Sequence, residues 1–253
     1  DFANVLVKTR EGRPIKIEKN SKSENHGPNA RVHASVLSMY DSSRIQGPKM
    51  DNQNVSWEQF NLNITAQLKA MSASNKRIVL LTQTFSSPTT DLIIKKFINK
   101  FPNIEHVVYD SISESKALDA FELSYDVRAL PTYDFSKADV IVSVAADILG
   151  DWQSGGFSSG YSKSRIPKKG KMSKHFQIEA NMSLSGANAD VRIPLKPSTQ
   201  KKALLKIYEY ISGENTNVSL DEKLEKKLKS IASSLKKSSG KGVFVTGIDD
   251  VDA

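Results

Sequence analysis

The sequence of 253 residues contains no cysteine. A chain without thiols forms no disulfide, has no thiolate nucleophile, and cannot bind zinc or an iron–sulfur cluster through cysteine. No stretch approaches the roughly 18 consecutive apolar residues of a membrane-spanning helix. The basic runs carry no interleaved aromatic residues and match no nucleic-acid-binding module. The composition therefore excludes cysteine-based chemistry, and we expect no nucleic acid among the partners.

Glycine-rich loops that cradle phosphate groups are missing as well. The run GGFSSG at 155–160 does not match G-x-G-x-x-G and follows no predicted strand. The run SSGKG at 238–242 precedes a strand, which is the wrong order for a Walker A loop. Neither run predicts a nucleotide site.

The four histidines are scattered along the chain. His106 and His175 begin predicted strands, where packing is the simpler role. His26 and His33 share one loop and are compatible with a metal pair, but no carboxylate or thiolate accompanies them. We predict no metal site.

Three aspartates surround one predicted strand end. Asp139 stands at the strand entry, and Asp147 and Asp151 follow the strand, an arrangement that could support acid–base chemistry. Structural roles at a strand entry, in a turn and at a helix start account for the same three aspartates. We therefore predict no catalytic residue in this chain.

Basic residues give the chain a net charge of +8 and gather in two places. The run Lys223–Lys241 reads as a lysine-rich amphipathic helix and its exit, with a solvated face. The run Lys163–Lys174 is a loop flanked by glycine and serine, which is either solvated or docked on an acidic neighbour. Its candidate partner contacts are Lys163, Arg165, Lys168, Lys169, Lys171 and Lys174.

The first part of the chain differs in pattern from the rest. Alternating apolar runs around Glu11 predict a β-hairpin, and a polar, irregular stretch follows it. We place a boundary near residue 53, between a small N-terminal β domain (1–53) and an α/β region (54–253) that is incomplete at its C-terminus. Both ends look cut, and we expect a piece of a longer polypeptide.

Strands and helices alternate beyond that boundary. The run 77–82 is continuously apolar, as expected for a strand covered on both sides, and 153–164 reads as a loop. The alternation predicts right-handed crossovers and a parallel, doubly wound, Rossmann-like sheet. Strands are predicted at 77–82, 106–110, 138–144, 175–180, 190–195 and 242–246, and helices from Ser56, Ser87, Ser111, Thr199 and Ser219.

Several stretches resemble the molybdopterin oxidoreductase superfamily. Gly12–Asn20, Gly27–Val32 and Asp41–Pro48 lie along its motifs G-R-x-x-x-I-x-G-N, G-x-x-C-x-K-G and D-P-x-R-L-x-x-P. Ser56 and Trp57 match the start of its S-W-x-x-A helix. ADVIVSVAAD and ADVRIPLKPSTQKKALL resemble its later A-D-x-I-x-x-x-G-S-N and P-G-T-D segments. The resemblance implies that the small N-terminal domain is a degenerate iron–sulfur domain.

The chain departs from that family at its cofactor positions. Asn29 stands in place of the last cluster cysteine, and an amide does not replace a thiolate on iron. Ala145–Asp147 stands where Gly-Ser-Asn approaches the pyranopterin dinucleotide, so methyl groups obstruct the approach and a carboxylate repels phosphate. The degenerate positions are Asn29, Ala145, Ala146, Asp147, Ser198 and Gln200.

Two longer stretches, LPTYDFSKADVIVSVAADILGDW and KMSKHFQIEANMSLSGANADVRIPLKP, resemble the iron–sulfur electron-transfer subunit of alternative complex III, a bacterial respiratory quinol oxidoreductase. In that family a molybdopterin-oxidoreductase-like half without molybdenum is joined to a ferredoxin-like half with iron–sulfur clusters. The resemblance implies a location on the periplasmic face of the inner membrane, with export by a twin-arginine-type route. It also implies neighbouring quinol-site membrane subunits and c-type haem subunits, with no cofactor in this chain itself.

We therefore expect a non-catalytic structural domain of a quinol-oxidising respiratory complex that delivers electrons to cytochrome c. The alternatives are a fragment of an active molybdopterin-dependent oxidoreductase and an independent basic binding module. If the frame of the cluster site is retained, Asn29 should lie in a turn held by side-chain and backbone hydrogen bonds, because its amide both donates and accepts.

Overall fold

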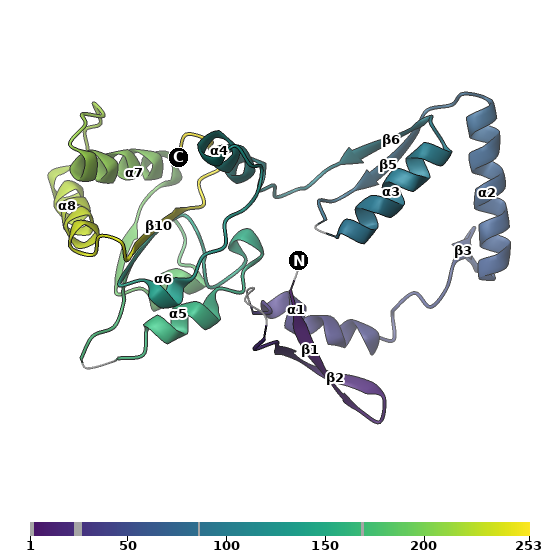
Figure 1. Ribbon diagram of the computed structural model, residues 1–253, viewed down its shortest axis with the longest axis horizontal. Coiled ribbons are helices and arrows are strands. Elements are labelled where there is room, and N and C mark those ends of the chain that lie inside the picture. Colours follow the sequence, from purple (N-terminus) through teal and green to yellow (C-terminus); the bar gives the residue numbers. More distant parts are fainter. Residues whose placement is uncertain (1–2, 23–26, 86, 168–169) are drawn as a thin grey trace. The chain divides into compact units, whose positions relative to one another are not determined.

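The computed structural model of the protein describes residues 3–22, 27–85, 87–167 and 170–253 (Figure 1). The chain forms two compact units. The middle unit contains Leu37–Ser113, and the N/C unit combines Ala3–Val36 with Glu114–Ala253. The predicted boundary near residue 53 does not coincide with this division, because the N-terminal hairpin groups with the C-terminal part of the chain.

The middle unit is built around one parallel strand pair. Strands β5 and β6 run parallel, and α3 connects them. Ser56 Oγ accepts a hydrogen bond from Gln59 N at 3.1 Å and begins α2, whereas Ser87 caps α3 ahead of Pro88. Both predicted helix starts are confirmed. The bounds are β3 Lys49–Met50, β4 Gln53–Asn54, α2 Trp57–Ala73, β5 Ile78–Thr82, α3 Pro88–Lys100 and β6 Ile104–Val108.

The apolar strand β5 is not covered on both sides. Its side chains alternate, and Val79 and Leu81 are 50% and 63% exposed. Among the described residues β5 pairs with β6 alone, in a two-stranded sheet. The prediction of a strand buried on both faces was therefore wrong, because a continuous apolar run does not itself supply a second layer.

The N/C unit contains an antiparallel hairpin and a four-stranded parallel sheet. Strands β1 and β2 turn at Glu11 and Gly12, both with positive φ, which confirms the predicted hairpin. The parallel sheet has the order β10-β7-β8-β9, which confirms an α/β fold with a parallel sheet. The strands are β1 Val5–Arg10, β2 Arg13–Lys19, β7 Val140–Val144, β8 Lys174–Glu179, β9 Val191–Pro194 and β10 Gly242–Thr246.

Three short helices of the N/C unit, α1, α5 and α6, were not predicted from the sequence. The stretch 153–164 contains α5, whose Tyr161 is buried and anchors a run otherwise rich in serine. Helix α8 begins later than predicted, because Asp221 rather than Ser219 accepts the capping hydrogen bond, from Leu224 N at 2.9 Å. The helices are α1 Ala30–Ala34, α4 Ser115–Tyr125, α5 Ser158–Ser164, α6 Leu184–Asn188, α7 Pro197–Ser212 and α8 Glu222–Lys237, with the short 3₁₀ helices η2 Phe135–Lys137 and η3 Trp152–Ser154. A further 3₁₀ helix, η1 Ser35–Met39, begins in the N/C unit and ends in the middle unit.

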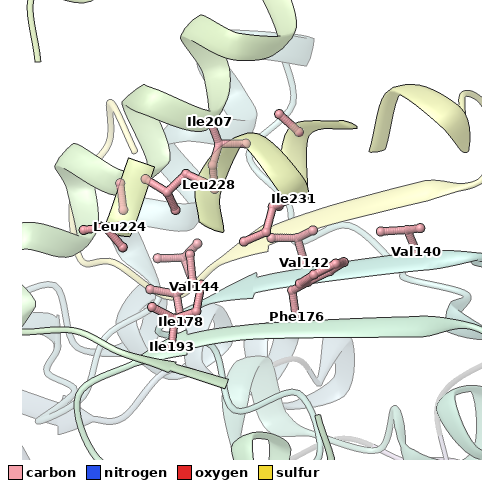
Figure 2. Close-up of a cluster of buried hydrophobic side chains, with 12 residues drawn as sticks. Val140, Val142, Val144, Phe176, Ile178, Ile193, Ile207, Leu224, Leu228 and Ile231 are labelled. Atoms are coloured by element: carbon pink, nitrogen blue, oxygen red, sulfur yellow. The ribbon is translucent and has the colours of Figure 1, made fainter. Parts of the chain in front are cut away.

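Two hydrophobic clusters cover the two faces of the parallel sheet. On one face, side chains of α7 and α8 meet those of β7, β8 and β9 (Figure 2). Leu228 and Ile231, which the sequence placed on one stripe of a helix, are fully buried there. The other cluster is aromatic and contains Phe135, Phe157 and Tyr161, with Tyr133 and Trp152 packed against it.

The longest described helix, α2, has 17 residues. No helix in the described part of the chain is both long and apolar enough to cross a membrane.

Candidate functional site

A pocket of about 260 Å³ lies at the carboxyl ends of β7 and β8. In sheets of parallel strands this edge is the usual place for a ligand. The pocket contains three of the degenerate positions, Ala145, Asp147 and Gln200. Its full lining is Ala145, Asp147, Gln177, Glu179, Ala180, Asn181, Ser183, Pro197 and Gln200.

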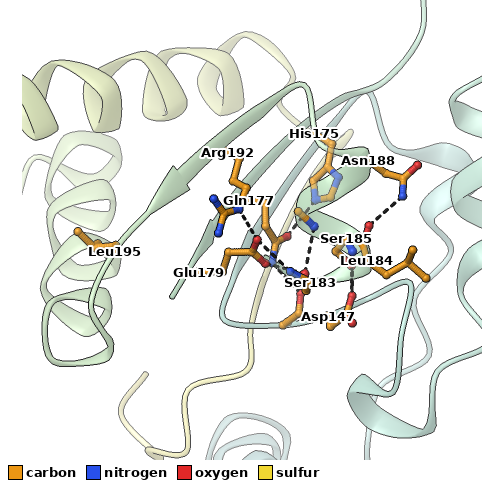
Figure 3. A network of polar contacts seen from close by, with 12 residues as sticks. Asp147, His175, Gln177, Glu179, Ser183, Leu184, Ser185, Asn188, Arg192 and Leu195 are labelled. Carbon is orange, nitrogen blue, oxygen red and sulfur yellow. Dashed lines mark hydrogen bonds and ion pairs between the residues drawn. The ribbon is translucent and has the colours of Figure 1, made fainter. Parts of the chain in front are cut away.

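Asp147 is bound to the start of α6. Its Oδ1 accepts hydrogen bonds from Ser185 N at 2.9 Å and from Ser185 Oγ at 2.6 Å (Figure 3). Ser185 Oγ in turn accepts from Leu149 N at 2.9 Å. The carboxylate therefore closes the turn after β7, which agrees with the turn role inferred from the sequence.

The other two aspartates of the predicted cluster lie apart from this network. Asp151 forms an ion pair with Arg31 at 3.1 Å. Asp139 precedes β7, is exposed, and lies 3.8 Å from Lys241 Nζ. The structure therefore does not bring Asp139, Asp147 and Asp151 together as an acid–base site.

Glu179 is a buried carboxylate at the end of β8 (Figure 3). Its Oε1 accepts from Arg192 Nε at 2.5 Å, and its Oε2 accepts from Ser183 Oγ at 2.6 Å. Burial raises the pKa of this carboxyl, but the hydrogen bonds from Ser183 and Arg192 outweigh burial and hold the pKa below its usual value. A side chain at Gly186 would collide with the Glu179 carboxylate. Glu179 is thus ionised, paired and closely packed.

His175 forms the centre of a buried polar chain. Its Nδ1 lies 3.1 Å from Tyr161 Oη, and its Nε2 lies 3.2 Å from Gln177 Oε1. Gln177 Nε2 then donates to the carbonyl of Ala146 at 3.1 Å. Burial lowers the pKa of His175 to about 4, so the imidazole is neutral at pH 7. The predicted packing role of His175 is confirmed.

The two other histidines that the structure describes, His33 and His106, lie apart from any metal-ligand set. His106 Nε2 lies 2.9 Å from Thr82 Oγ1, within the β5–β6 pair. His33 Nδ1 lies 3.0 Å from the carbonyl of Ile17. His26 is outside the described residues, so the structure does not test the His26–His33 pair. Across the described ranges, no three His, Asp or Glu side chains are arranged to hold a metal ion.

Backbone polar groups of the two alanines after β7, Ala145 and Ala146, form hydrogen bonds within the protein. Ala145 has a positive φ of 58°, and its N–H donates to Ile178 O at 2.8 Å. The buried carbonyl of Ala146 accepts from Ser143 Oγ at 2.7 Å as well as from Gln177. The N–H of Ala145 and the carbonyl of Ala146 are therefore bonded within the protein.

The remaining degenerate positions in this region are at the start of α7. Gln200 is buried and donates to the carbonyl of Leu195 at 3.0 Å. Ser198 is exposed in the first turn of the helix. Gln177 and Glu179 were not predicted as site residues, although their alternation with the apolar Phe176 and Ile178 in β8 was a usable signal.

Asn29 connects two distant parts of the N/C unit. It is buried and caps α1, where its Oδ1 accepts from Val32 N at 2.8 Å. Its Nδ2 donates to the carbonyl of Ser154 at 2.6 Å. The expectation of a turn held by side-chain hydrogen bonds is confirmed for Asn29; residues 23–26 of the same loop are outside the described part.

The predicted partner-contact residues do not behave as one surface. Arg165 donates to both carboxylate oxygens of Asp190, at 2.6 and 2.8 Å, and its side chain is only 18% exposed. Lys174 Nζ lies 4.9 Å from the centroid of the Phe176 ring. Lys163 and Lys171 are exposed, and Lys168 and Lys169 are outside the described residues. Arg165 is therefore a structural residue rather than a free contact.

Comparisons with models of known protein families and with curated protein sequences found no match. The structure itself defines a mixed α/β protein. Most of the polar side chains that line its pocket form hydrogen bonds within the protein. In this pocket Ser183 Oγ donates to Glu179 Oε2 at 2.6 Å, and the other oxygen of the same carboxylate accepts from Arg192. The two carboxylates of the pocket, Asp147 and Glu179, both accept bonds from neighbouring protein donors.

Proposed function

We propose that this chain is a non-catalytic structural domain of a membrane-associated respiratory complex that oxidises quinol and reduces cytochrome c. The resemblance to the iron–sulfur electron-transfer subunit of alternative complex III, within the molybdopterin oxidoreductase superfamily, supports this assignment. On this proposal the parallel sheet belongs to a doubly wound, Rossmann-like fold, and the hairpin segment is a degenerate iron–sulfur domain. The observation that carries the proposal is that five of the six altered cofactor positions form internal hydrogen bonds, namely Asn29, Ala145, Ala146, Asp147 and Gln200.

The residues after β7 do not fit a pyranopterin dinucleotide. Such a cofactor carries phosphate groups, whereas the pocket presents the carboxylates of Asp147 and Glu179. The carbonyl of Ala146 already accepts two internal hydrogen bonds, and the methyl group of Ala145 occupies a place where the family has glycine. We therefore derive no chemical step through this group.

The hydrogen bonds of Asn29 to Val32 and Ser154 support a scaffolding role. A cluster thiolate would tie its loop to neighbouring cysteines through iron, whereas Asn29 ties α1 to the chain near Ser154 through its amide. One neutral side chain thus keeps two segments together without carrying electrons.

The proposal assigns partners by the same resemblance. They are quinol-site membrane subunits, c-type haem subunits and a cluster-bearing ferredoxin-like half of the same polypeptide, on the periplasmic face of the bacterial inner membrane. Iron–sulfur clusters and haems belong to those parts, and this chain contributes shape and contacts.

Substitution in the assembled complex tests the proposal. In Asp147→Ala the turn after β7 loses its bond to Ser185, so the yield of assembled complex should fall while quinol oxidation per haem stays unchanged. Asp139→Ala is the matched control, because it removes the same charge from an exposed residue outside the pocket. Haem absorbance measures assembly, and cytochrome c reduction measures turnover.

Elemental analysis of the same preparations separates the proposal from its runner-up, a fragment of an active molybdopterin-dependent oxidoreductase. The proposal expects neither molybdenum nor tungsten in a stoichiometric amount. Stoichiometric molybdenum that is lost in Asp147→Ala, together with lower turnover per haem, would establish the runner-up instead.

A further inference from the structure

The two edges of the four-stranded sheet differ in how they are protected. Edge strand β9 contains Arg192 and ends in Pro194, which has no N–H to offer a neighbour. Edge strand β10 has the sequence GVFVT, with neither proline nor charge. Charged residues, proline and bulges are the usual protection of a free edge against pairing. The β10 edge has none of them.

The backbone groups of β10 that face this edge can be assigned from its ladder. Gly247 N donates to Val144 O at 2.8 Å, and Lys241 O accepts from Asp139 N at 2.9 Å, so the odd-numbered residues face β7. Alternate residues of a strand direct their N–H and C=O to opposite neighbours. The even-numbered residues Gly242, Phe244 and Thr246 therefore point to the open side, where no described strand pairs with them.

An apolar groove of about 540 Å³ lies beside this edge. Phe244 of β10 forms one wall, and the exposed apolar side chains of α7, Tyr208 and Ile211, form another; they are 46% and 40% exposed. A strand placed beside β10 would direct every second side chain to the helix-covered face and hence into the groove. The lining is Leu204, Ile207, Tyr208, Ile211, Leu235, Lys236, Ser238, Ser239, Gly240, Gly242, Phe244 and Ala253.

The charged residues at the two ends of β10 favour one orientation of a strand that pairs with its open edge. Lys236, Lys237 and Lys241 lie just before the strand, and Asp249 lies just after it. Among the described ion pairs none includes Lys236 or Lys237, and Lys241 has only a long, exposed contact of 3.8 Å with Asp139. A parallel neighbour complements this arrangement when acidic residues precede it and basic residues follow it.

We propose that the β10 edge binds, as a parallel fifth strand, an extended polypeptide segment with acidic residues before and basic residues after an alternating apolar core. Main-chain hydrogen bonds to Gly242, Phe244 and Thr246 hold the segment, and the groove receives its apolar side chains. The inference concerns the surface alone and does not rest on the proposed function.

The experiment adds the synthetic peptide EEVTVTVKK to the full chain and follows amide hydrogen exchange by NMR. Exchange at Gly242, Phe244 and Thr246 should slow at least about tenfold. Val243 and Val245, which already bond to β7, serve as internal controls and should not change. The reversed peptide KKVTVTVEE should bind about tenfold more weakly at low salt, and the difference should shrink at high salt.

Ile211→Glu tests the groove, because it puts a charge on an exposed wall residue without disturbing the core. Binding of EEVTVTVKK should weaken at least about tenfold. Ile166→Glu is the matched control, with the same change at an exposed isoleucine outside the groove.

Unchanged exchange at the three outward amides under saturating peptide would overturn the proposal, as would equal binding of the two peptides at low salt. Binding that survives Ile211→Glu would also contradict it. If the same amides become protected on raising the protein concentration alone, with a dimer in sedimentation, the occupant is a second copy and the proposed segment is wrong.

Discussion

Strands β5 and β7 have the same length and similar sequences, IVLLT and VIVSV, yet β7 is buried along its whole length and no residue of β5 is fully buried. Strand β7 lies between β10 and β8, with hydrophobic clusters on both sides of the sheet. Among the described residues, strand β5 has a single neighbour, β6. The difference shows that an apolar run predicts a strand, whereas burial depends on partners elsewhere in the chain.

The same contrast extends to the two units. In the described part of the middle unit, Phe101 and Ile104 are the buried hydrophobic side chains, whereas Ile112 is almost wholly exposed. The N/C unit has two continuous clusters. Because burial of apolar surface is the main source of stability, the N/C unit should be the more stable of the two.

The largest expected effect comes from replacing one leucine in each unit by alanine. Leu228→Ala removes a fully buried side chain of the N/C unit and should lower the free energy of unfolding by about 3 kcal/mol or more. Leu81→Ala, at a residue 63% exposed, should change it by less than about 0.5 kcal/mol. Urea titrations of the full chain follow Trp152 in the N/C unit and Trp57 in the middle unit.

Single-tryptophan backgrounds, Trp57→Phe and Trp152→Phe, keep the two signals apart. Equal losses from Leu228→Ala and Leu81→Ala would show that β5 is as well buried as α8 in solution.

The next effect concerns pH and His175. Its pKa is about 4 in the folded protein and near 6.5 in the unfolded chain, so the unfolded chain binds more protons between these values. Stability of the N/C unit should therefore be constant above about pH 6.5 and decrease as pH falls towards 4, by on the order of 3 kcal/mol. Urea titrations between pH 7 and 4 measure the slope.

His175→Gln should remove most of that slope, because glutamine does not titrate. His106→Gln, in the middle unit, is the control and should leave the slope of the N/C unit as it is. A slope that persists in His175→Gln would assign the pH dependence to other groups.

A smaller effect distinguishes Arg165, which is hydrogen-bonded, from the exposed lysines in the run Lys163–Lys174. Arg165→Ala removes the two hydrogen bonds that Arg165 donates to the partly buried Asp190, which keeps only the bond from His175 N, and should cost about 2 kcal/mol. Lys163→Ala, at an exposed residue of α5, should cost less than about 0.5 kcal/mol. Thermal unfolding of the two variants provides the comparison, and equal costs would contradict the structural role of Arg165.

The smallest effect concerns the link of the N-terminal segment to the rest of its unit. Asn29→Ala removes the cap of α1 and the bond to Ser154, and should cost about 1–2 kcal/mol. Asn29→Asp keeps an acceptor for Val32 N but loses the donor, so it should preserve the cap and free the segment near Ser154. Hydrogen exchange at Val32 and Gly155 distinguishes the two variants, and identical exchange in both would argue against a bridging amide.

Local signals in the sequence predicted local structure well. The capping serines Ser56 and Ser87 and the turn at Glu11 gave helix starts and a hairpin, because each depends on neighbouring residues. Helix α5 was missed because its run of serine and glycine has weak helix propensity, and the burial of Tyr161 among distant residues compensates.

Long-range pairings were the part that the sequence did not predict. Arg165 looked like one of several surface cations, because its partner Asp190 lies 25 residues away. The candidate site was found from the ends of the predicted strands, which placed Asp147 correctly. The donors that satisfy it, on Ser185, come from a separate helix and could not be assigned from spacing.

The close approach of Glu179 to Gly186 restricts the order in which substitutions at these two positions can occur. A methyl group at position 186 would collide with a carboxylate that Arg192 and Ser183 hold in place. Replacing Glu179 first leaves room for a later alanine at 186, whereas the reverse order passes through a protein with a steric clash in its interior. The two positions are therefore epistatic: an alanine at 186 fits only after Glu179 has been replaced, and that first replacement itself leaves Arg192 and Ser183 without their acceptor.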